Sequence, residues 1–115
     1  MKWDSITSMQ QVDTLLEESK QKLILFFKHS TRCSISAQAL AKIERQWTEE
    51  WNKFAKLAYL DILKYREVSN YVSQKLNVEH QSPQLLVVKE GVCIFNSSHN
   101  AINLHDVSDQ IKKSI

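Results

Sequence analysis

The chain has 115 residues, of which 43% are hydrophobic and 24% charged, and its formal net charge is only +2. This composition predicts one globular domain spanning residues 1–115, and it gives no reason to expect nucleic acid or a membrane as a partner. No apolar run approaches the roughly 18 residues that a membrane span needs, and the first residues lack the pattern of a secretory signal. We therefore expect a cytoplasmic protein.

The two cysteines, Cys33 and Cys93, are too few and too far apart for a disulfide framework. In a reducing cytosol they are better explained as one reactive thiol and one packing residue. The four histidines lack the paired spacing of a metal site, so we expect no metal and no tightly bound cofactor.

The first half of the chain predicts a helix, a strand and a second helix. Thr7 and Gln10 match a capping box, and the apolar residues behind them predict a helix over Ser8–Ser19. Leu23–Phe27 is apolar on both sides, as in a central strand covered on two faces. From Cys33 onward an apolar stripe at helical spacing predicts a helix of about five turns whose aromatic members pack in the core. The stripe consists of Ile35, Ala39, Leu40, Ile43, Trp47, Trp51 and Phe54.

The second half continues the alternation. Glu90-Gly91 predicts a tight hairpin turn, and Asn103 with Asp106 predicts the cap of a last helix. The other predicted elements are a strand at Lys56–Ile62, a helix at Tyr65–Leu76, and strands at Gln84–Lys89 and Val92–Phe95.

This order of elements predicts an α/β protein. Strand–helix–strand units impose parallel pairing, and the late hairpin adds antiparallel strands. The arrangement matches a thioredoxin-like fold: a central four-stranded mixed sheet flanked by helices, with an N-terminal helical extension. Two local features agree, since Cys33 follows the first strand and Pro83 directly precedes the third.

Cys33 is the main candidate for chemistry. It stands where a helix begins, and the free backbone N–H groups and dipole of a helix start stabilise a thiolate, the reactive form of cysteine. Arg32 adds a positive charge beside it. The alternative is a buried cysteine that acts as a small hydrophobic residue.

Cys33 and Ser36 form a Cys-x-x-Ser arrangement, with serine where a dithiol oxidoreductase carries its resolving cysteine. Serine cannot resolve a mixed disulfide, so an outside thiol must do so. Ser36 is expected either to donate a hydrogen bond to the thiolate or to be a plain helix-surface serine. His29 is expected either to tune the thiol or to be an exposed histidine at a strand end.

Ser82 and Pro83 are the candidate substrate-docking residues. A cis bond between them would turn the Ser82 backbone toward the thiol, where an extended partner chain could pair with it; the alternative is a trans proline that begins an ordinary strand. Cys93 lies in a strand expected at or near the sheet edge away from Cys33. It is interpreted as a packing residue, the alternative being a resolving cysteine.

These residues resemble the bacilliredoxin-like YtxJ family of low-G+C Gram-positive bacteria, whose members are thioredoxin-fold proteins. The resemblance covers nearly the whole chain; one departure is Ser34, where relatives commonly carry proline. It implies a monothiol redox protein that uses bacillithiol, a low-molecular-weight thiol, as co-substrate and bacillithiolated client proteins as partners. The resemblance rests on residues 28–36, Arg66-Glu-Val-Ser69-Asn70, His80-Gln-Ser82-Pro83-Gln84 and Ser98-His99-Asn-Ala-Ile102.

Two functions from different classes remain open. The first is a glutaredoxin-like thiol–disulfide oxidoreductase that reduces mixed disulfides between protein cysteines and bacillithiol through Cys33. The second is a non-catalytic thioredoxin-fold adaptor that binds a protein partner in the same cleft. An iron–sulfur carrier ranks third, because Ser34 and Ile35 occupy the turn where such monothiol proteins carry phenylalanine and glycine.

Overall fold

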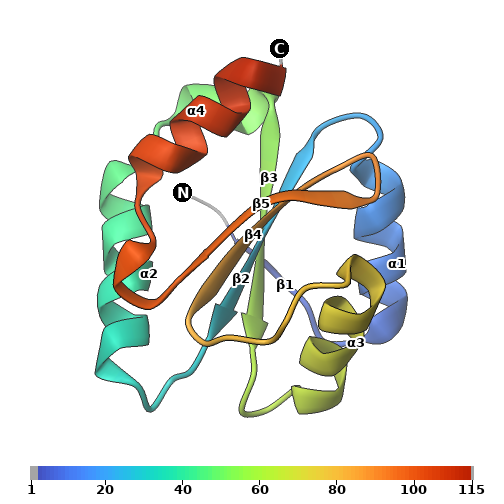
Figure 1. Cartoon of the computed structure of the whole chain (residues 1–115), viewed down its shortest axis with the longest axis vertical. Coiled ribbons are helices and arrows are strands. Elements are labelled where there is room, and N and C mark those ends of the chain that lie inside the picture. Colours follow the sequence, from blue (N-terminus) through green and yellow to red (C-terminus); the bar gives the residue numbers. More distant parts are fainter. Residues whose placement is uncertain (1–2, 115) are drawn as a thin grey trace.

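The computed structural model describes residues 3–114. Five strands form one mixed sheet in the order β1-β3-β2-β4-β5, with β2 at its centre (Figure 1). The elements, in chain order, are β1 (Asp4–Ser5), α1 (Met9–Glu18), β2 (Leu23–His29), α2 (Ser34–Gln46), η1 (Glu49–Lys53), β3 (Ala55–Asp61), α3 (Arg66–Leu76), β4 (Gln84–Lys89), β5 (Val92–Ser98), η2 (His99–Ala101) and α4 (Leu104–Ser114).

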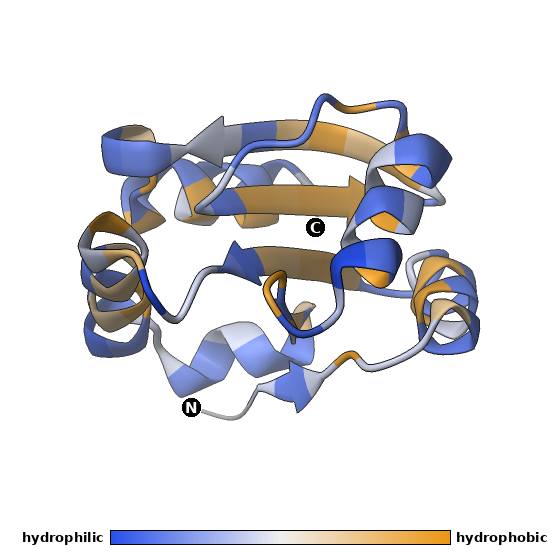
Figure 2. Ribbon diagram, turned by 90° about the horizontal axis from the view of Figure 1, so that it is seen from below, coloured by the Kyte–Doolittle hydropathy of each residue, from blue (hydrophilic) through white to orange (hydrophobic). Residues whose placement is uncertain are grey.

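Helices cover both faces of the sheet: α2 and α4 lie on one side, and α1 and α3 on the other (Figure 1). The strand sequences explain this, because successive side chains of a strand point to opposite faces. In β2, Leu25 and Phe27 pack with α2 and α4, whereas Ile24 and Phe26 pack with α1 and α3. All seven β2 residues are buried, as expected for a central strand covered on both faces. Figure 2 shows the resulting apolar strands between helices that are largely polar on the outside.

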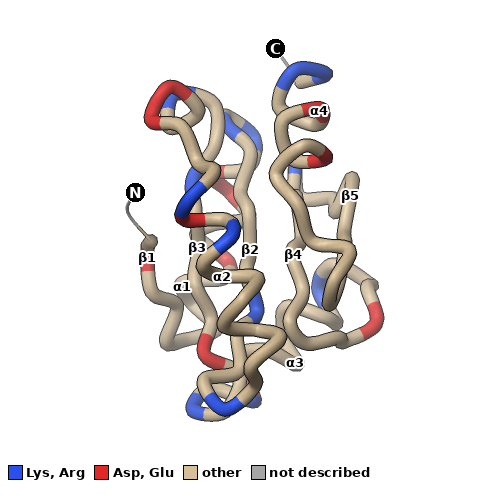
Figure 3. The backbone as a smooth tube through the Cα atoms, turned by 90° about the vertical axis from the view of Figure 1, so that its left-hand side faces the viewer, with Lys and Arg blue, Asp and Glu red and all other residues tan. Residues whose placement is uncertain are grey.

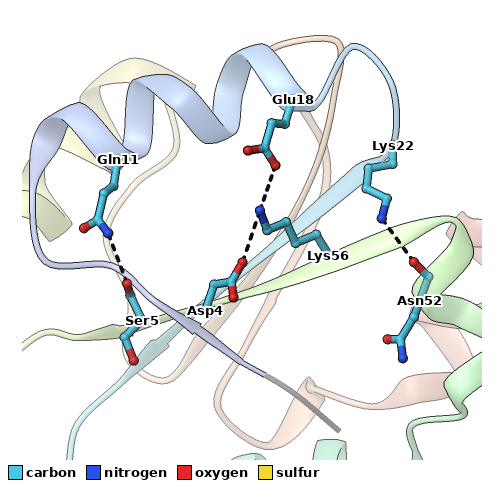
Figure 4. Close-up of polar contacts among 7 residues, drawn as sticks. All are labelled: Asp4, Ser5, Gln11, Glu18, Lys22, Asn52 and Lys56. Carbon is cyan, nitrogen blue, oxygen red and sulfur yellow. Dashed lines mark hydrogen bonds and ion pairs between the residues drawn. The ribbon is translucent and has the colours of Figure 1, made fainter.

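The sheet has one strand more than the four predicted. β1 is a two-residue edge strand that pairs in parallel with β3, too short to leave a pattern in the sequence. Lys56 of β3 forms ion pairs with β1 and with α1. Its ammonium group lies 3.1 Å from the Asp4 carboxylate and 2.9 Å from the Glu18 carboxylate (Figure 4). The edge strand is therefore tied to both the sheet and the first helix.

The second helix is shorter than the predicted five turns. α2 ends at Gln46, and Trp47 adopts an extended backbone before the short 3₁₀ helix η1. The Trp47 indole donates a hydrogen bond to the Asn52 side chain and stacks edge-to-face on Trp51 at 5.1 Å. The aromatic residues of the stripe therefore pack in the core, as predicted. They do not lie on one continuous helix, because the helix ends at Gln46 and the chain turns into η1.

The first helix begins one residue later than predicted. Its capping box uses Ser8 and Gln11 instead of Thr7 and Gln10. The Ser8 hydroxyl accepts a hydrogen bond from the Gln11 N–H at 3.2 Å, and the Gln11 side-chain oxygen accepts from the Ser8 N–H at 3.1 Å. The Gln11 oxygen also accepts from the Thr7 N–H, so both polar residues before the helix are used.

The β4–β5 hairpin contains the predicted turn and an irregularity that the sequence did not reveal. Glu90 and Gly91 both have positive φ, 52° and 78°, which a two-residue hairpin turn requires. In β5 the register skips Ile94, since Phe95 pairs with Val87 and Cys93 with Val88. This bulge directs Phe95 to the face with α2 and α4, and Cys93 to the face with α1 and α3.

Charged residues lie mainly in loops and on helices (Figure 3). Within residues 3–114, no helix is long and apolar enough to cross a membrane.

Candidate active site

The candidate site lies at the carboxyl end of β2. After His29 a short turn leads to Cys33, which is the N-cap residue of α2 with extended backbone angles (φ −107°, ψ 122°). The Cys33 N–H donates to the Ser30 carbonyl at 3.2 Å, and the Cys33 carbonyl accepts from the Ala37 N–H at 3.0 Å. The thiol itself makes no capping hydrogen bond and is only partly buried. The structure thus places Cys33 at the helix start rather than deep in the core.

The surroundings of Cys33 favour negative charge. The first turn of α2 contains no acidic residue, so no carboxylate competes for the free N–H groups of the helix start. Arg32 is exposed and forms no ion pair within the part of the chain that the structure describes. Its charge therefore remains available to a thiolate or to an anionic substrate.

His29 and Ser36 form a buried pair behind the turn. The His29 Nδ1 and Ser36 Oγ lie 2.6 Å apart, and Ser36 Oγ also accepts a hydrogen bond from the Ser30 N–H at 3.0 Å. His29 is 6% exposed and Ser36 fully buried, so the alternatives of an exposed histidine and a surface serine are wrong. Burial lowers the pKa of His29, against smaller raising effects of the Asp61 and Glu44 charges.

This pair orders the turn that carries the thiol. No hydrogen bond joins Ser36 to the Cys33 sulfur among the residues described, because the Ser36 hydroxyl is already engaged by His29 and Ser30. Ser36 thus acts on the shape of the turn, whereas the direct contact with the thiol predicted from the sequence is not formed here.

The loop before β4 reaches the same end of the sheet. Gln84 pairs with Lys28 in the antiparallel β2–β4 ladder, so Pro83 lies beside the end of β2. The Ser82–Pro83 peptide bond is cis, as predicted, and Pro83 is buried. The Ser82 hydroxyl is buried and has no hydrogen-bond partner among residues 3–114. The topology therefore brings both predicted docking residues to the end of the sheet where Cys33 lies.

Lys28 is the residue that sequence reasoning missed. It directly follows the predicted strand Leu23–Phe27, and it is 0% exposed. Its ammonium group contacts the Ser69 carbonyl oxygen at 3.2 Å, the Ser73 hydroxyl at 2.6 Å and the His80 Nδ1 at 3.1 Å. Burial lowers the pKa of Lys28 to about 8. The only sequence signal was a lysine directly after five apolar strand residues.

Cys93 lies far from this chemistry. It is in the edge strand β5, as predicted, and the bulge at Ile94 turns it toward the face covered by α1 and α3. Cys33 instead caps α2, which packs on the opposite face. Burial raises the pKa of the Cys93 thiol, and its sulfur contacts the Phe95 carbonyl at 3.3 Å. Both cysteines are free thiols.

A shallow cavity of about 410 Å³ adjoins the turn before Cys33. It is lined by Thr31, Arg32, Asp61, Leu63 and Lys64. The Asp61 carboxylate accepts hydrogen bonds from the backbone N–H groups of Leu63 and Lys64, which fixes this wall. The cavity thus has two cationic side chains, one carboxylate and one apolar side chain on its walls, next to the turn that leads to Cys33. No cluster of three metal-binding side chains occurs between residues 3 and 114.

Comparison with solved structures identifies the class of protein. A protein described as a provisionally assigned oxidoreductase with a thioredoxin fold superposes with a TM-score of 0.80 at 28% identity, over 96% of this chain and 93% of the other. Thioredoxin from Fasciola hepatica (TM-score 0.70, 18% identity, 95% and 96% covered) and the thioredoxin pre-protein of Schistosoma mansoni (0.68, 23%, 100% and 100%) have the same fold. The molecule is a thioredoxin-fold protein with one thiol at the start of its second helix.

The family follows from the sequence comparison. The model of the monothiol bacilliredoxin BrxC matches residues 4–107, nearly the whole chain. The chain belongs to this family, which confirms the resemblance to the bacilliredoxins noted from its motifs and supports a redox function.

Proposed function

We propose that the protein is a monothiol oxidoreductase that removes bacillithiol from client proteins through Cys33. The observation that carries the proposal is the isolation of this thiol. Cys33 lies at a helix start, Ser36 occupies the place of a resolving cysteine, and Cys93 faces the other side of the sheet. A thiol so placed exchanges with partners from solution and not within the chain.

The reaction is a pair of thiol–disulfide exchanges. The Cys33 thiolate attacks the bacillithiol sulfur of a mixed disulfide, and the client cysteine leaves as a thiolate that takes up a proton. Cys33 then carries bacillithiol in a disulfide. A second low-molecular-weight thiol attacks that adduct, giving a disulfide of the two small thiols and restoring the Cys33 thiolate.

The residues around Cys33 have distinct proposed parts in this cycle. The helix start and Arg32 stabilise the thiolate, while His29 and Ser36 hold the turn in shape. Ser82, directed by the cis bond to Pro83, presents its backbone N–H and carbonyl to the client, with which an extended peptide can pair. The Pro83 carbonyl already accepts a hydrogen bond from the His99 N–H at 3.0 Å, so Pro83 shapes this short edge and does not pair itself. The cavity with Arg32 and Lys64 on its walls provides space for the small thiol.

Mass spectrometry of the transferred adduct tests the proposal. A client protein carrying bacillithiol is incubated with the Cys93→Ser variant, which has Cys33 as its one thiol. We expect the client to lose the bacillithiol mass and Cys33 to gain it. An adduct that stays on the client would refute the enzymatic function and favour the adaptor, which needs the cleft but no transfer.

A further inference from the structure

The hydrogen bonds of Lys28 account for every proton of its ammonium group. Such a group has three N–H donors, and the Ser69 carbonyl, the Ser73 hydroxyl and the His80 Nδ1 are the three acceptors, at 3.2, 2.6 and 3.1 Å. All three acceptors are neutral. Lys28 forms no ion pair with any carboxylate among residues 3–114. A buried cation is thus held by hydrogen bonds alone.

This arrangement defines the protonation state of His80. To accept from Lys28, Nδ1 must carry a lone pair, so the imidazole is neutral with its proton on Nε2. Burial is the largest cause that lowers the pKa of His80, and the charges of Lys28 from β2 and Arg66 from α3 lower it further. A second ring proton, added on Nδ1, would remove the acceptor and turn the ring into a cation. Two cations would then lie 3.1 Å apart.

His80 is also part of the loop that ends in Pro83. The buried Gln84 side chain donates to the Glu79 carbonyl at 3.0 Å and accepts from the Gln81 N–H at 3.3 Å, on either side of His80. Gln84 is the register partner of Lys28. Gln84 of β4 and Lys28 of β2 therefore hold the same loop, residues 79–83. Gln84 binds its backbone, and Lys28 binds the His80 ring.

We propose that Lys28 is a positioning residue, which through His80 fixes the segment 79–83 where it receives the backbone of a client. This inference rests on the proposed role of Ser82 and Pro83 as the docking edge. It gives the loop a dependence on acidity: protonation of His80 breaks the contact with Lys28 and releases the segment. Binding of a client should then weaken in acid beyond any change in the thiol.

The test separates docking from thiol chemistry. A client peptide is prepared with its cysteine linked to 5-thio-2-nitrobenzoate, and Cys33 attacks the peptide sulfur so that the coloured thiolate leaves. The rate against peptide concentration gives an apparent binding constant, and alkylation by iodoacetamide reports the thiol without docking. All proteins carry Cys93→Ser. Bacillithiol is absent, so the outcome is independent of whether bacillithiol is the natural adduct.

We expect Lys28→Met to weaken the apparent binding of the peptide by about tenfold, the effect of losing a hydrogen bond to a charged group, with alkylation unchanged. The matched control is Lys20→Met, which removes an exposed lysine at the far end of β2 and should leave both rates as they are. Equal peptide binding in Lys28→Met, or an equal fall in both rates, would overturn the proposal.

Two further measurements cover the case in which Lys28→Met does not fold. In ¹⁵N spectra of the unsubstituted protein at neutral pH, His80 Nδ1 should be unprotonated; an Nδ1–H tautomer would refute the proposal. Because the pKa of His80 is lowered from its ordinary value of 6.5, peptide exchange should fall relative to alkylation as the pH drops below 6.5. His80→Asn places an amide oxygen near the Nδ1 position that does not titrate in this range, so this relative fall should disappear. Its persistence would also refute the proposal.

Discussion

The two ends of the central sheet hold a lysine in opposite ways. At the site end, Lys28 is fully buried among neutral acceptors and its pKa is lowered to about 8. At the other end, the partly exposed Lys56 bridges the carboxylates of Asp4 and Glu18, and hydrogen bonding to Glu18 is the largest cause that raises its pKa (Figure 4). One cation is destabilised by its surroundings and the other stabilised.

The difference separates the end of the sheet that carries the candidate site from the end that does not. At the end of the sheet opposite Cys33, polar groups bind one another. The Glu90 N–H donates to the Ser19 carbonyl, and the Gly91 N–H donates to the Ser19 hydroxyl. At the site end, the buried Lys28 contacts the His80 ring, and Cys33 follows Lys28 by five residues at the start of α2. The contact between Lys28 and His80 depends on a single proton, whereas fixed ion pairs respond mainly to salt.

Among the substitutions that test this difference between the two ends, those of the two cysteines should differ most in their effect on activity. Cys33→Ser should abolish removal of the small thiol from a client, because the attacking sulfur is gone. Cys93→Ser should retain most of the activity, since that thiol lies on the other face of the sheet. The measurement is release of bacillithiol from a labelled client. Activity retained in Cys33→Ser would contradict the assignment of the site.

A second prediction concerns the cost of the buried Lys28 charge. Its pKa is lowered from 10.5 to about 8, so the folded state loses the proton first. The charge therefore destabilises the fold below pH 8, and the penalty disappears as the pH rises from 8 to 10.5. Over this interval the free energy of unfolding should rise by up to about 3 kcal/mol more in the unsubstituted protein than in Lys28→Met.

Urea unfolding at several pH values measures this difference, and Lys20→Met serves as the control for an exposed lysine. Parallel pH profiles for the unsubstituted protein and Lys28→Met would show that the Lys28 pKa is not depressed.

A smaller loss of stability is expected at Ser36. Ser36→Ala leaves the His29 Nδ1 and the Ser30 N–H without their partner in a buried place, at a cost of about 1–3 kcal/mol. Ser34→Ala, two residues earlier and exposed, is the matched control and should have almost no effect. Thermal unfolding distinguishes the two. Equal melting temperatures would mean that the pair does not hold the turn.

The smallest effect should come from the opposite end. Lys56→Met removes two partly exposed ion pairs, which contribute about 0.5–1 kcal/mol in total. Because the pKa of Lys56 is raised, this contribution is complete below its ordinary pKa of 10.5 and is lost only above it. Unfolding at low and high salt should show the loss shrinking with salt, with activity unchanged. A salt-independent loss would point to packing instead.

Much of the fold could be predicted from the chain because its strands are strongly apolar and its few turn residues are informative. Gln84–Lys89, the Glu90-Gly91 turn and the Asn103 cap were all predicted correctly. The two-residue strand β1 and the end of α2 were missed. The first is too short for a periodic signal, and the second depends on how Trp47 packs with Trp51 and Asn52 in the folded chain.

The site was predicted less completely, for a physical reason. A thiol at a strand–helix junction and a proline before a strand leave local patterns, so Cys33 and Pro83 were found. The partners of Lys28 are Ser69, Ser73 and His80, more than 40 residues away along the chain. Such a cluster exists only after β2, α3 and the loop before β4 have assembled. Within the strand, the one sign that this lysine is buried is its place directly after five apolar residues.

The bulge at Ile94 in β5 decides whether the two cysteines of one chain can form a disulfide with each other. Without the skip at Ile94, Cys93 and Phe95 would share a face of the sheet, because residues two apart in a regular strand do so. The skip moves one sulfur across the sheet from the other. A chain oxidised at Cys33 therefore has no second cysteine on that side of the sheet with which to form a disulfide. If Cys33 works as proposed, every oxidising equivalent that it accepts must be passed to a molecule from solution.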